Sequence, residues 1–151
     1  MPFRTPLLAS ILGLATAGAV LADTNPAVDA RQAQFTLYAH NLAVVGSMAQ
    51  GRMDYDADAA QTAADNLYHL TRHDQGRMWP EGTDNASIEG TRALPGIWED
   101  LDDFTAKFVA LQEAAESLQA VAGDGLDALR PAVGQLGAAC AACHDANRAE
   151  R

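Results

Sequence analysis

Apolar side chains recur every three or four positions in several segments of this sequence, which is the period of an amphipathic helix. The first segment predicts a helix over residues 26–50, with Gly51 as its stop. The second predicts a helix from Asp56, a suitable N-cap, to about His73, with small residues that allow close contact between helices. The two apolar stripes consist of Phe35, Tyr38, Leu42, Val45 and Ala49, and of Ala60, Ala63, Leu67 and Leu70.

The second half of the chain carries two further helical patterns. The third helix is predicted to open at Ile97 or Trp98 and to end at Gly123. The fourth starts near Asp124, and Pro131 inside it either kinks the helix or marks a restart after a short first turn. The two core faces consist of Trp98, Leu101, Phe104, Phe108, Leu111, Ala115 and Leu118, and of Leu126, Leu129, Val133, Leu136, Cys140 and Cys143. Because no segment reads as a strand, we predict an all-α protein, an antiparallel four-helix bundle.

The segment between the second and third helices, residues 74–96, has a different composition. It is rich in glycine, proline and polar residues and shows no clear periodicity. A connection of this length in a small domain is usually functional or a crossover between distant elements. We therefore expect this loop to contribute to a site or to cross one end of the bundle.

The N-terminus has the composition of a secretory signal peptide. Arg4 gives it a positive start, residues 7–22 are almost wholly apolar or small, and the polar Asp23 follows. A membrane anchor is the alternative, but the apolar run is short for a bilayer and no stop signal flanks it. We predict that residues 1–22 are removed by cleavage near Ala22, and that residues 23–151 form one exported domain.

The chain is acidic, with a formal net charge of −10. Such a surface repels nucleic acid and anionic membranes. It either favours a basic partner or simply keeps the protein soluble. No Ser/His/Asp order, phosphate-binding loop or carboxylate pair suggests catalysis, so we do not expect an enzyme.

The strongest chemical signal is the pentapeptide Cys140-x-x-Cys143-His144 near the C-terminus, which contains the only two cysteines of the chain. This spacing attaches a c-type haem: each cysteine forms a thioether with a haem vinyl group, and the histidine ligates the iron. Positions three and four apart share one side of a helix, so the three side chains face together. Attachment of this kind takes place outside the bacterial cytoplasm, which agrees with the predicted export and favours a periplasmic location.

Two other interpretations of the motif exist. A zinc site needs four ligands, and the motif supplies only three. The other histidines are distant in sequence and show no paired ligand spacing; they are His40, His69 and His73. A redox dithiol normally sits where a strand passes into a helix, whereas this motif lies deep in a helical, alanine-rich segment. Haem attachment is therefore favoured over both.

Several further segments, taken with the motif, resemble the cytochrome c′ family and its class II c-type relatives. The matching pieces are Arg31-Gln32-Ala-Gln-Phe35, Met48-Ala-Gln-Gly51, Tyr55-Asp56, Trp79-Pro-Glu-Gly-Thr83, Pro95-Gly-Ile97-Trp98, and Cys140 to Arg148. The resemblance spans about the whole mature chain. It implies a four-helix bundle with one covalent haem c near the C-terminus and a homodimer formed through the first two helices. The chain departs from the family at Asn147, where an aromatic residue is common, and at Pro131.

The residue across the haem from His144 decides the chemistry. A strong sixth ligand gives a low-spin electron carrier, whereas an empty position gives high-spin iron that binds a small gas. In the low-spin relatives a methionine of the first helix takes this position, and the resemblance places Phe35 there, which has no donor atom. It implies a five-coordinate haem that binds nitric oxide or carbon monoxide, transfers electrons to an unknown redox partner, or does both. The alternative is a low-spin electron-transfer cytochrome whose sixth ligand is another residue, with Met78 the least excluded.

The remaining candidates concern the edge and the proximal side of the haem. Arg31 and Gln32 project from the same side of the first helix as the distal phenylalanine. The resemblance implies that they bind the haem propionates, and a guanidinium pairs with a carboxylate in two-pronged fashion; the alternative is a solvated Arg31. Thr91 in the long loop is a weaker propionate candidate. Arg148, four residues after His144, either tunes that ligand or complements the helix dipole.

Overall fold

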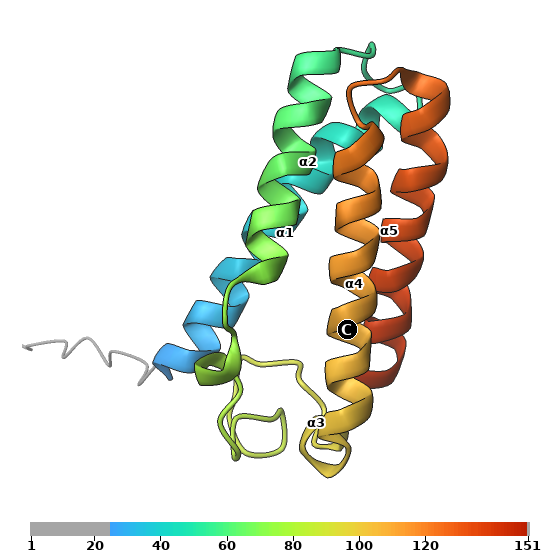
Figure 1. The fold of residues 1–151 in the computed structure, drawn as a ribbon. Helices are drawn as coiled ribbons and strands as arrows, with labels where there is room; N and C mark the ends of the chain where they lie inside the picture. Colours follow the sequence, from blue (N-terminus) through green and yellow to red (C-terminus); the bar gives the residue numbers. More distant parts are fainter. Residues whose placement is uncertain (1–24, 151) are drawn as a thin grey trace, which may run out of the picture.

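Four long helices run alternately up and down through residues 25–150, the part of the chain that this computed structural model describes (Figure 1). They are α1 (Pro26–Ala49), α2 (Ala57–Arg72), α4 (Leu101–Val121) and α5 (Leu126–Asn147). Two short helices, η1 (Gly76–Met78) and α3 (Gly96–Glu99), lie in the connection between α2 and α4. The predicted all-α antiparallel bundle is confirmed. The predicted signal peptide, residues 1–22, lies outside the described residues.

Each of the first three long helices begins at a side chain that caps it. Asn25 accepts a hydrogen bond from the N–H of Ala27 at 2.9 Å, and Pro26 occupies the first turn, where no N–H is needed. Asp56 accepts from the N–H of Ala59 at 2.8 Å, so the predicted N-cap of the second helix is confirmed. These caps satisfy backbone donors that have no partner inside the helix.

The predicted third helix is divided in two at Asp100. This residue has an extended φ of −139°, and its carboxylate accepts a hydrogen bond from the N–H of Asp103 at 2.9 Å. A new helix therefore starts at Leu101, and the helical register of the upstream residues is lost. As a result Leu101 is 50 % exposed, and its prediction as a core residue is wrong. The downstream positions Phe104 and Leu118 are buried as predicted.

The last helix passes through Pro131 without a break. It runs unbroken from Leu126 to Asn147, so no restart occurs after its first turn. The preceding Gly125 has φ of +115°, a backbone conformation that L side chains rarely adopt and that glycine permits. Pro131 is exposed, and it lies close enough to the helix start that few backbone hydrogen bonds are affected. The motif near the C-terminus is thus placed by one continuous helix.

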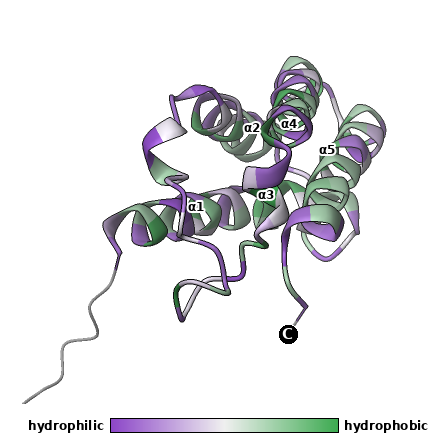
Figure 2. Cartoon of the chain, turned by 90° about the horizontal axis from the view of Figure 1, so that it is seen from below, coloured by the Kyte–Doolittle hydropathy of each residue, from purple (hydrophilic) through white to green (hydrophobic). Residues whose placement is uncertain are grey.

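Helix α1 buries a face rotated from the predicted stripe. It is tilted against the other three helices: Figure 2 looks along α2, α4 and α5 nearly end-on and sees α1 more from the side. Gln34 and Asn41 are buried on it, although both are polar. The amide of Gln34 donates to the carbonyl of Leu70 at 2.6 Å, and Asn41 accepts from Asn66 at 2.9 Å. These bonds turn a polar face of α1 towards α2, while Phe35 remains only half-buried.

The buried apolar residues form two clusters. The larger one lies among α1, α2, α4 and α5, and its largest fully buried side chains are Met48, Leu118, Leu129 and Leu136. The smaller one, at the end of the bundle crossed by the long loop, comprises Ala93, Ile97 and Phe104, with Cys143 packed against it. The haem-attachment motif therefore lies where the second cluster meets α5.

Candidate haem site

The last turns of α5 present the attachment motif on one inward side. Cys140, Cys143 and His144 are each half-buried, and both thiols are free. Burial raises the pKa of both thiols, and the neighbouring Cys143 adds to this effect at Cys140. Asn147 is buried, and its amide donates to the carbonyl of Cys143 at 3.1 Å. This hydrogen bond fixes the last turn of the helix at the position where the family commonly has an aromatic residue.

Phe35 of α1 lies across from His144 of α5. Their ring centroids are 6.4 Å apart with an interplanar angle of 62°. Phe35 also makes edge contacts with Tyr38, at 5.7 Å, and with Trp79, at 6.3 Å. Two residues that are distant in sequence are therefore brought together, as the predicted placement of Phe35 opposite the ligand requires.

The imidazole of His144 lies in a setting that favours its neutral form. Burial lowers its pKa, and the charges of Arg148 and Arg92 lower it further, with Asp145 acting in the opposite direction. Neutral imidazole is the form that ligates a metal. The influence of Arg148 agrees with a role beside the proximal ligand, whereas Arg92 was missed because it lies in the loop far from the motif.

The end of the chain clamps the long loop against α5. Backbone hydrogen bonds join Leu94 to Asn147 at 3.0 Å, and Ala149 to Arg92 at 2.8 Å. The side chain of Arg92 also donates to the carbonyl of Ala149, at 2.8 Å from Nε. The loop is thus held beside the proximal histidine, a placement that no local pattern in the sequence indicates.

Arg31 is buried and tied to the loop. Its Nη1 donates to the hydroxyl of Thr83 at 2.7 Å and to the carbonyl of Met78 at 3.3 Å. Its Nη2 donates to the hydroxyl of Thr91 at 2.7 Å and to the carbonyl of Thr83. Only 3 % of the surface of Arg31 is exposed, so the alternative interpretation, a solvated Arg31, is wrong. The predicted residues Arg31 and Thr91 are therefore in direct contact.

The charge of Arg31 has no carboxylate within ion-pairing distance among the described residues. Burial lowers the pKa of its guanidinium, and the charge of Asp84 partly offsets this. The guanidinium carbon lies 4.8 Å from the ring centroid of Trp79. Gln32, by contrast, is exposed and donates to the carbonyl of Gly90 at 2.7 Å. A buried cation without an anion favours a nearby anionic group such as a propionate.

The rings of Trp79, Phe104 and Phe108 pack together beside Phe35 and form an aromatic wall. Trp79 stands at its centre, 4.7 Å from Phe104 and 6.2 Å from Phe108 between ring centroids. The indole N–H of Trp79 is buried and has no hydrogen-bond partner. Such orphaned donors are rare in folded proteins, and a bound group is one explanation for them. Sequence reasoning noticed Trp79 only as part of a family motif and assigned it no role.

These residues fit a covalently attached haem. Two free, half-buried thiols and an imidazole share one side of α5, and an aromatic wall with Phe35 faces them. Arg31 offers a positive charge without a paired carboxylate, and Trp79 offers an indole N–H without a hydrogen-bond partner. Within residues 25–150, no three His, Cys, Asp or Glu side chains gather in an arrangement that could hold a metal ion by themselves.

An antiparallel four-helix bundle with this motif at the end of its last helix defines a c-type haem protein of the bundle class. The family model described as Cytochrome C' matches residues 26–148, and the chain belongs to that family. It therefore binds haem c covalently, and the predicted cofactor and family are confirmed. Within the described residues, no helix has the length and hydrophobicity needed to cross a membrane.

Known relatives match this chain over four fifths of its length or more. A cytochrome c′ of Cereibacter sphaeroides is 39 % identical over 148 residues, covering 98 % of this chain and 99 % of that protein. A cytochrome c-554 of the same organism is 40 % identical over 121 residues, covering 80 % and 79 %. A solved structure, cytochrome c′ from Rhodobacter Spheriodes, superposes with a TM-score of 0.82 at 40 % identity, covering 83 % of this chain and 96 % of that one.

Proposed function

We propose that this protein carries a high-spin, five-coordinate haem whose open position binds small gases, nitric oxide and carbon monoxide above all. The observation that supports this most directly is Phe35 facing His144 at 6.4 Å between ring centroids. The phenyl ring has no donor atom for iron. When bound, haem supplies an iron centre with one position free for a diatomic gas and capable of one-electron transfer.

Apart from Met78, the histidines and methionines that could serve as a sixth ligand are poorly placed in the described part of the chain. The imidazoles of His40, His69 and His73 are exposed at the surface. Met48 is buried in the larger apolar cluster, and Met53 is 48 % exposed in the turn after α1. None of these residues shares the aromatic wall around Phe35.

The chain's own residues then have separate tasks. His144 would hold the iron from α5, and Phe35, whose ring faces that imidazole, would restrict the space for a gas ligand. The distal surroundings are aromatic, with Tyr38 and Trp79 beside Phe35. The Tyr38 hydroxyl is engaged with Leu70 and Gln75. The phenyl ring of Phe35 offers no hydrogen bond to hold bound dioxygen, which favours nitric oxide and carbon monoxide. One related solved structure is a nitric oxide complex of a cytochrome c′ mutant from Alcaligenes xylosoxidans, 34 % identical with a TM-score of 0.72.

Absorption spectroscopy of the purified holoprotein tests the proposal. We expect broad high-spin bands in both oxidation states, and a clear spectral change when carbon monoxide is added to the reduced protein. Sharp low-spin bands, with a methionine-sulfur charge-transfer band in the oxidised protein, would contradict it. Pyridine haemochrome analysis of the same sample verifies that the haem is attached, so a failed preparation is recognised as such.

A low-spin electron-transfer cytochrome is the second candidate. Met78 favours it, because this half-buried residue lies in the loop beside Arg31, and its carbonyl accepts a hydrogen bond from that side chain. The identity to a cytochrome c-554, 40 % over 80 % of this chain, is close to the 39 % over 98 % found for a cytochrome c′. Replacing Met78 with leucine distinguishes the two: a low-spin spectrum that becomes high-spin identifies the ligand, and an unchanged high-spin spectrum supports the first candidate.

Export to the periplasm and a homodimer complete the proposal. The N-terminal segment supports export, and haem attachment outside the cytoplasm requires it. The family resemblance supports a dimer through α1 and α2, and Leu37 on α1 has 47 % of its surface exposed. We expect Leu37→Glu to halve the mass measured by light scattering, whereas Leu101→Glu on α4 leaves it unchanged. A monomeric parent protein would overturn the dimer.

A further inference from the structure

A groove runs along the outside of the bundle between α1 and α5. Its volume is about 610 Å³, which is within the usual range of small-molecule sites in proteins. Small and apolar side chains make up most of its lining, among them Ala39, Ala43 and Ala49 of α1 and Val133 of α5. Two arginines are the only charged residues among its described lining residues. The groove is therefore apolar along most of its length and positively charged at one place.

Two glycines of α5 line this groove although nothing in the described chain requires a glycine at either position. A Cβ added at Gly134 or Gly137 would meet no other side chain or segment within 4 Å, and neither residue has a positive φ. Glycine inside a helix weakens it relative to alanine. The packing of this chain gives no reason for that loss, whereas the close approach of another molecule to the helix backbone is a reason for which proteins use glycine.

The two arginines lie together at the end of the groove far from the haem site. Arg130 is in the second turn of α5, and Arg52 follows the end of the antiparallel α1. The Nε of Arg130 donates to a backbone carbonyl of α1 at 3.1 Å, and its Nη1 is 3.9 Å from the fully exposed carboxylate of Asp127. Arg52 donates to the side chain of Gln50 and forms no ion pair within residues 25–150. An exposed ion pair of this length is weak, so both guanidinium groups remain available to an anion.

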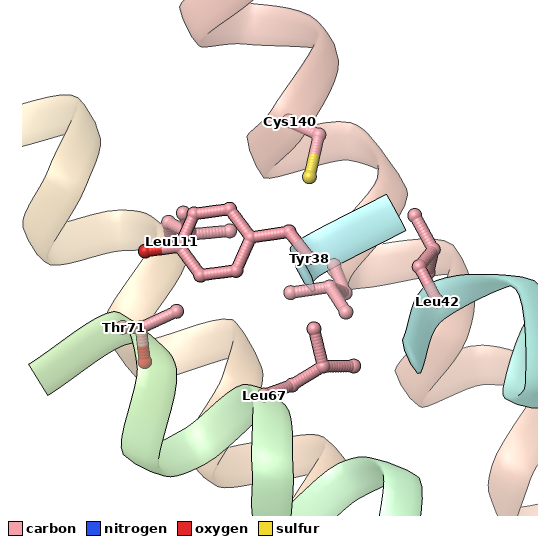
Figure 3. Close-up of a pocket in the computed structure, with 7 residues that line it drawn as sticks. Tyr38, Leu42, Leu67, Thr71, Leu111 and Cys140 are labelled. Carbon is pink, nitrogen blue, oxygen red and sulfur yellow. The ribbon is translucent and has the colours of Figure 1, made fainter. Parts of the chain in front are cut away.

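The haem site and the arginine end of the groove are well separated. Arg130 is 14 residues before His144 on one continuous helix, which is about 21 Å at 1.5 Å per residue. Figure 3 shows the Sγ of Cys140 directed towards interior side chains of α1, α2 and α4. Leu42 is the only residue that lines both that interior space and the groove. A haem held by the attachment motif therefore leaves the arginine end of the groove open.

We propose that this groove binds one free long-chain alkyl carboxylate, with its carboxylate at Arg52 and Arg130 and its alkyl chain along the two glycines. A guanidinium pairs with a carboxylate through two parallel hydrogen bonds. The groove follows α1 from Ala39 to Gln50, about 16 Å at 1.5 Å per residue, which is close to the length of extended dodecanoate. The whole chain has a net charge of −10, which disfavours docking to an anionic membrane and leaves the attraction to the local arginine pair. This inference goes beyond the proposed function and does not depend on how the iron is coordinated.

Calorimetric titration of the holoprotein with dodecanoate, below the concentration at which it forms micelles, tests the proposal. We expect saturable binding of one molecule per chain. The double variant Arg52→Gln, Arg130→Gln should weaken it about tenfold or more, because a hydrogen bond to a charged group is lost at each position. Arg77→Gln removes an exposed arginine outside the groove and is expected to leave binding unchanged. Equal weakening by both changes of charge would overturn the proposal, because the attraction would then come from the overall charge.

A second variant tests where the alkyl chain lies. Gly134→Leu fills the groove and is expected to abolish binding. The fold should persist, because the new side chain enters open space and leucine favours a helix. Circular dichroism and thermal denaturation verify this, and the midpoint Tm should rise. Ala138→Leu adds a leucine at an exposed position of the same helix outside the groove and should leave binding unchanged.

Three results overturn the proposal. The first is dodecanoate binding that survives Gly134→Leu. The second is a folded parent holoprotein that binds no dodecanoate, as expected if the haem or a second copy of the chain fills the groove. The third is binding to phosphatidylglycerol vesicles without binding of free dodecanoate, which would make the groove a membrane contact instead. Because the spin state of the iron is read from the absorption spectrum of the same samples, failure of the proposed function is recognised separately.

Discussion

In the proposed function, Phe35 of α1 and His144 of α5 determine the haem chemistry. Their ring centroids are 6.4 Å apart, and the surrounding side chains are aromatic. A residue facing the ligand acts on the iron through two properties, its volume and whether it has a donor atom. The phenyl ring has volume and no donor. A single substitution at this position that adds a donor should therefore change the class of the haem without changing the fold.

We predict that Phe35→Met converts most of the iron to the six-coordinate, low-spin state. Methionine is flexible and carries a thioether sulfur, which is a haem ligand in other c-type cytochromes. The measurement is the absorption spectrum of the oxidised protein, where a sulfur charge-transfer band should appear. Phe35→Leu is the matched control, because it alters the volume without a donor and should remain high-spin. A low-spin Phe35→Leu protein would show that another residue supplies the sixth ligand.

Residues differ in how far their roles were predictable. The motif gave Cys140, Cys143 and His144 from spacing alone, and the family resemblance pointed to Phe35. The hydrogen-bond partners of Arg31 could not be predicted from the sequence, because Thr83 and Thr91 are 52 and 60 residues away in a loop without periodicity. Tertiary hydrogen bonds of this kind leave no local signal.

At the scale of elements, the connection between α2 and α4 has little regular secondary structure. It is nevertheless held to the candidate haem site by many hydrogen bonds. Arg31 of α1 binds three of its residues, and the C-terminal tail pairs with its far end. Helix boundaries around it were only partly predictable. The side chain of Asp100 starts a new helix, and this capping bond overrides the continuous apolar pattern that predicted a single helix. Both capping side chains and apolar periodicity influence where a helix begins, and here the cap at Asp100 decides the boundary.

Arg31→Lys is predicted to loosen the loop. Lysine has three donors on one atom and cannot reproduce the fork that joins Thr83 and Thr91. Hydrogen bonds to a charged group contribute about 1.5–3 kcal/mol each, so the net loss in the free energy of unfolding should be about 2 kcal/mol. Chemical denaturation measures this loss, and tryptic cleavage after Arg77 should become faster. Arg52→Lys at an exposed position is the control; equal effects of both variants would argue against the anchoring role.

The loop should also be sensitive to acid. Hydrogen bonds from the Ser87 hydroxyl and from the backbone N–H groups of Ala86 and Ser87 lower the pKa of Asp84. A carboxyl whose pKa is depressed on folding contributes stability above its ordinary pKa of about 4, and this is lost as the pH falls through the lower folded value. We predict that cleavage of the loop by pepsin accelerates below about pH 4. Asp84→Asn should remove most of this pH dependence; an unchanged profile would assign it to other carboxyl groups.

At the scale of the whole molecule, the four helices do not hold each other equally. The broad contacts are those of α4 with α5, α1 with α2 and α2 with α4, whereas the tilted α1 meets α5 less extensively (Figure 1). At the end far from the haem site, the hydroxyl of Tyr55 closes the bundle. It donates to the carbonyl of Ala122 at 2.9 Å and accepts from the N–H of Gly125 at 2.9 Å. At the other end, α1 and α5 face each other through Phe35 and His144, where the haem belongs.

Covalent haem should therefore stabilise the junction of α1 and α5 more than the rest of the bundle. A ligand that binds only the folded state protects the parts it bridges from local opening. We predict that the double variant Cys140→Ala, Cys143→Ala, which forms no thioether, shows amide hydrogen exchange faster by roughly tenfold or more in residues 26–38 of α1. Exchange near Ala122 and Gly125 should change little, because Tyr55 holds that end without the haem. A uniform increase along all four helices would mean that the haem acts on global unfolding rather than on this junction.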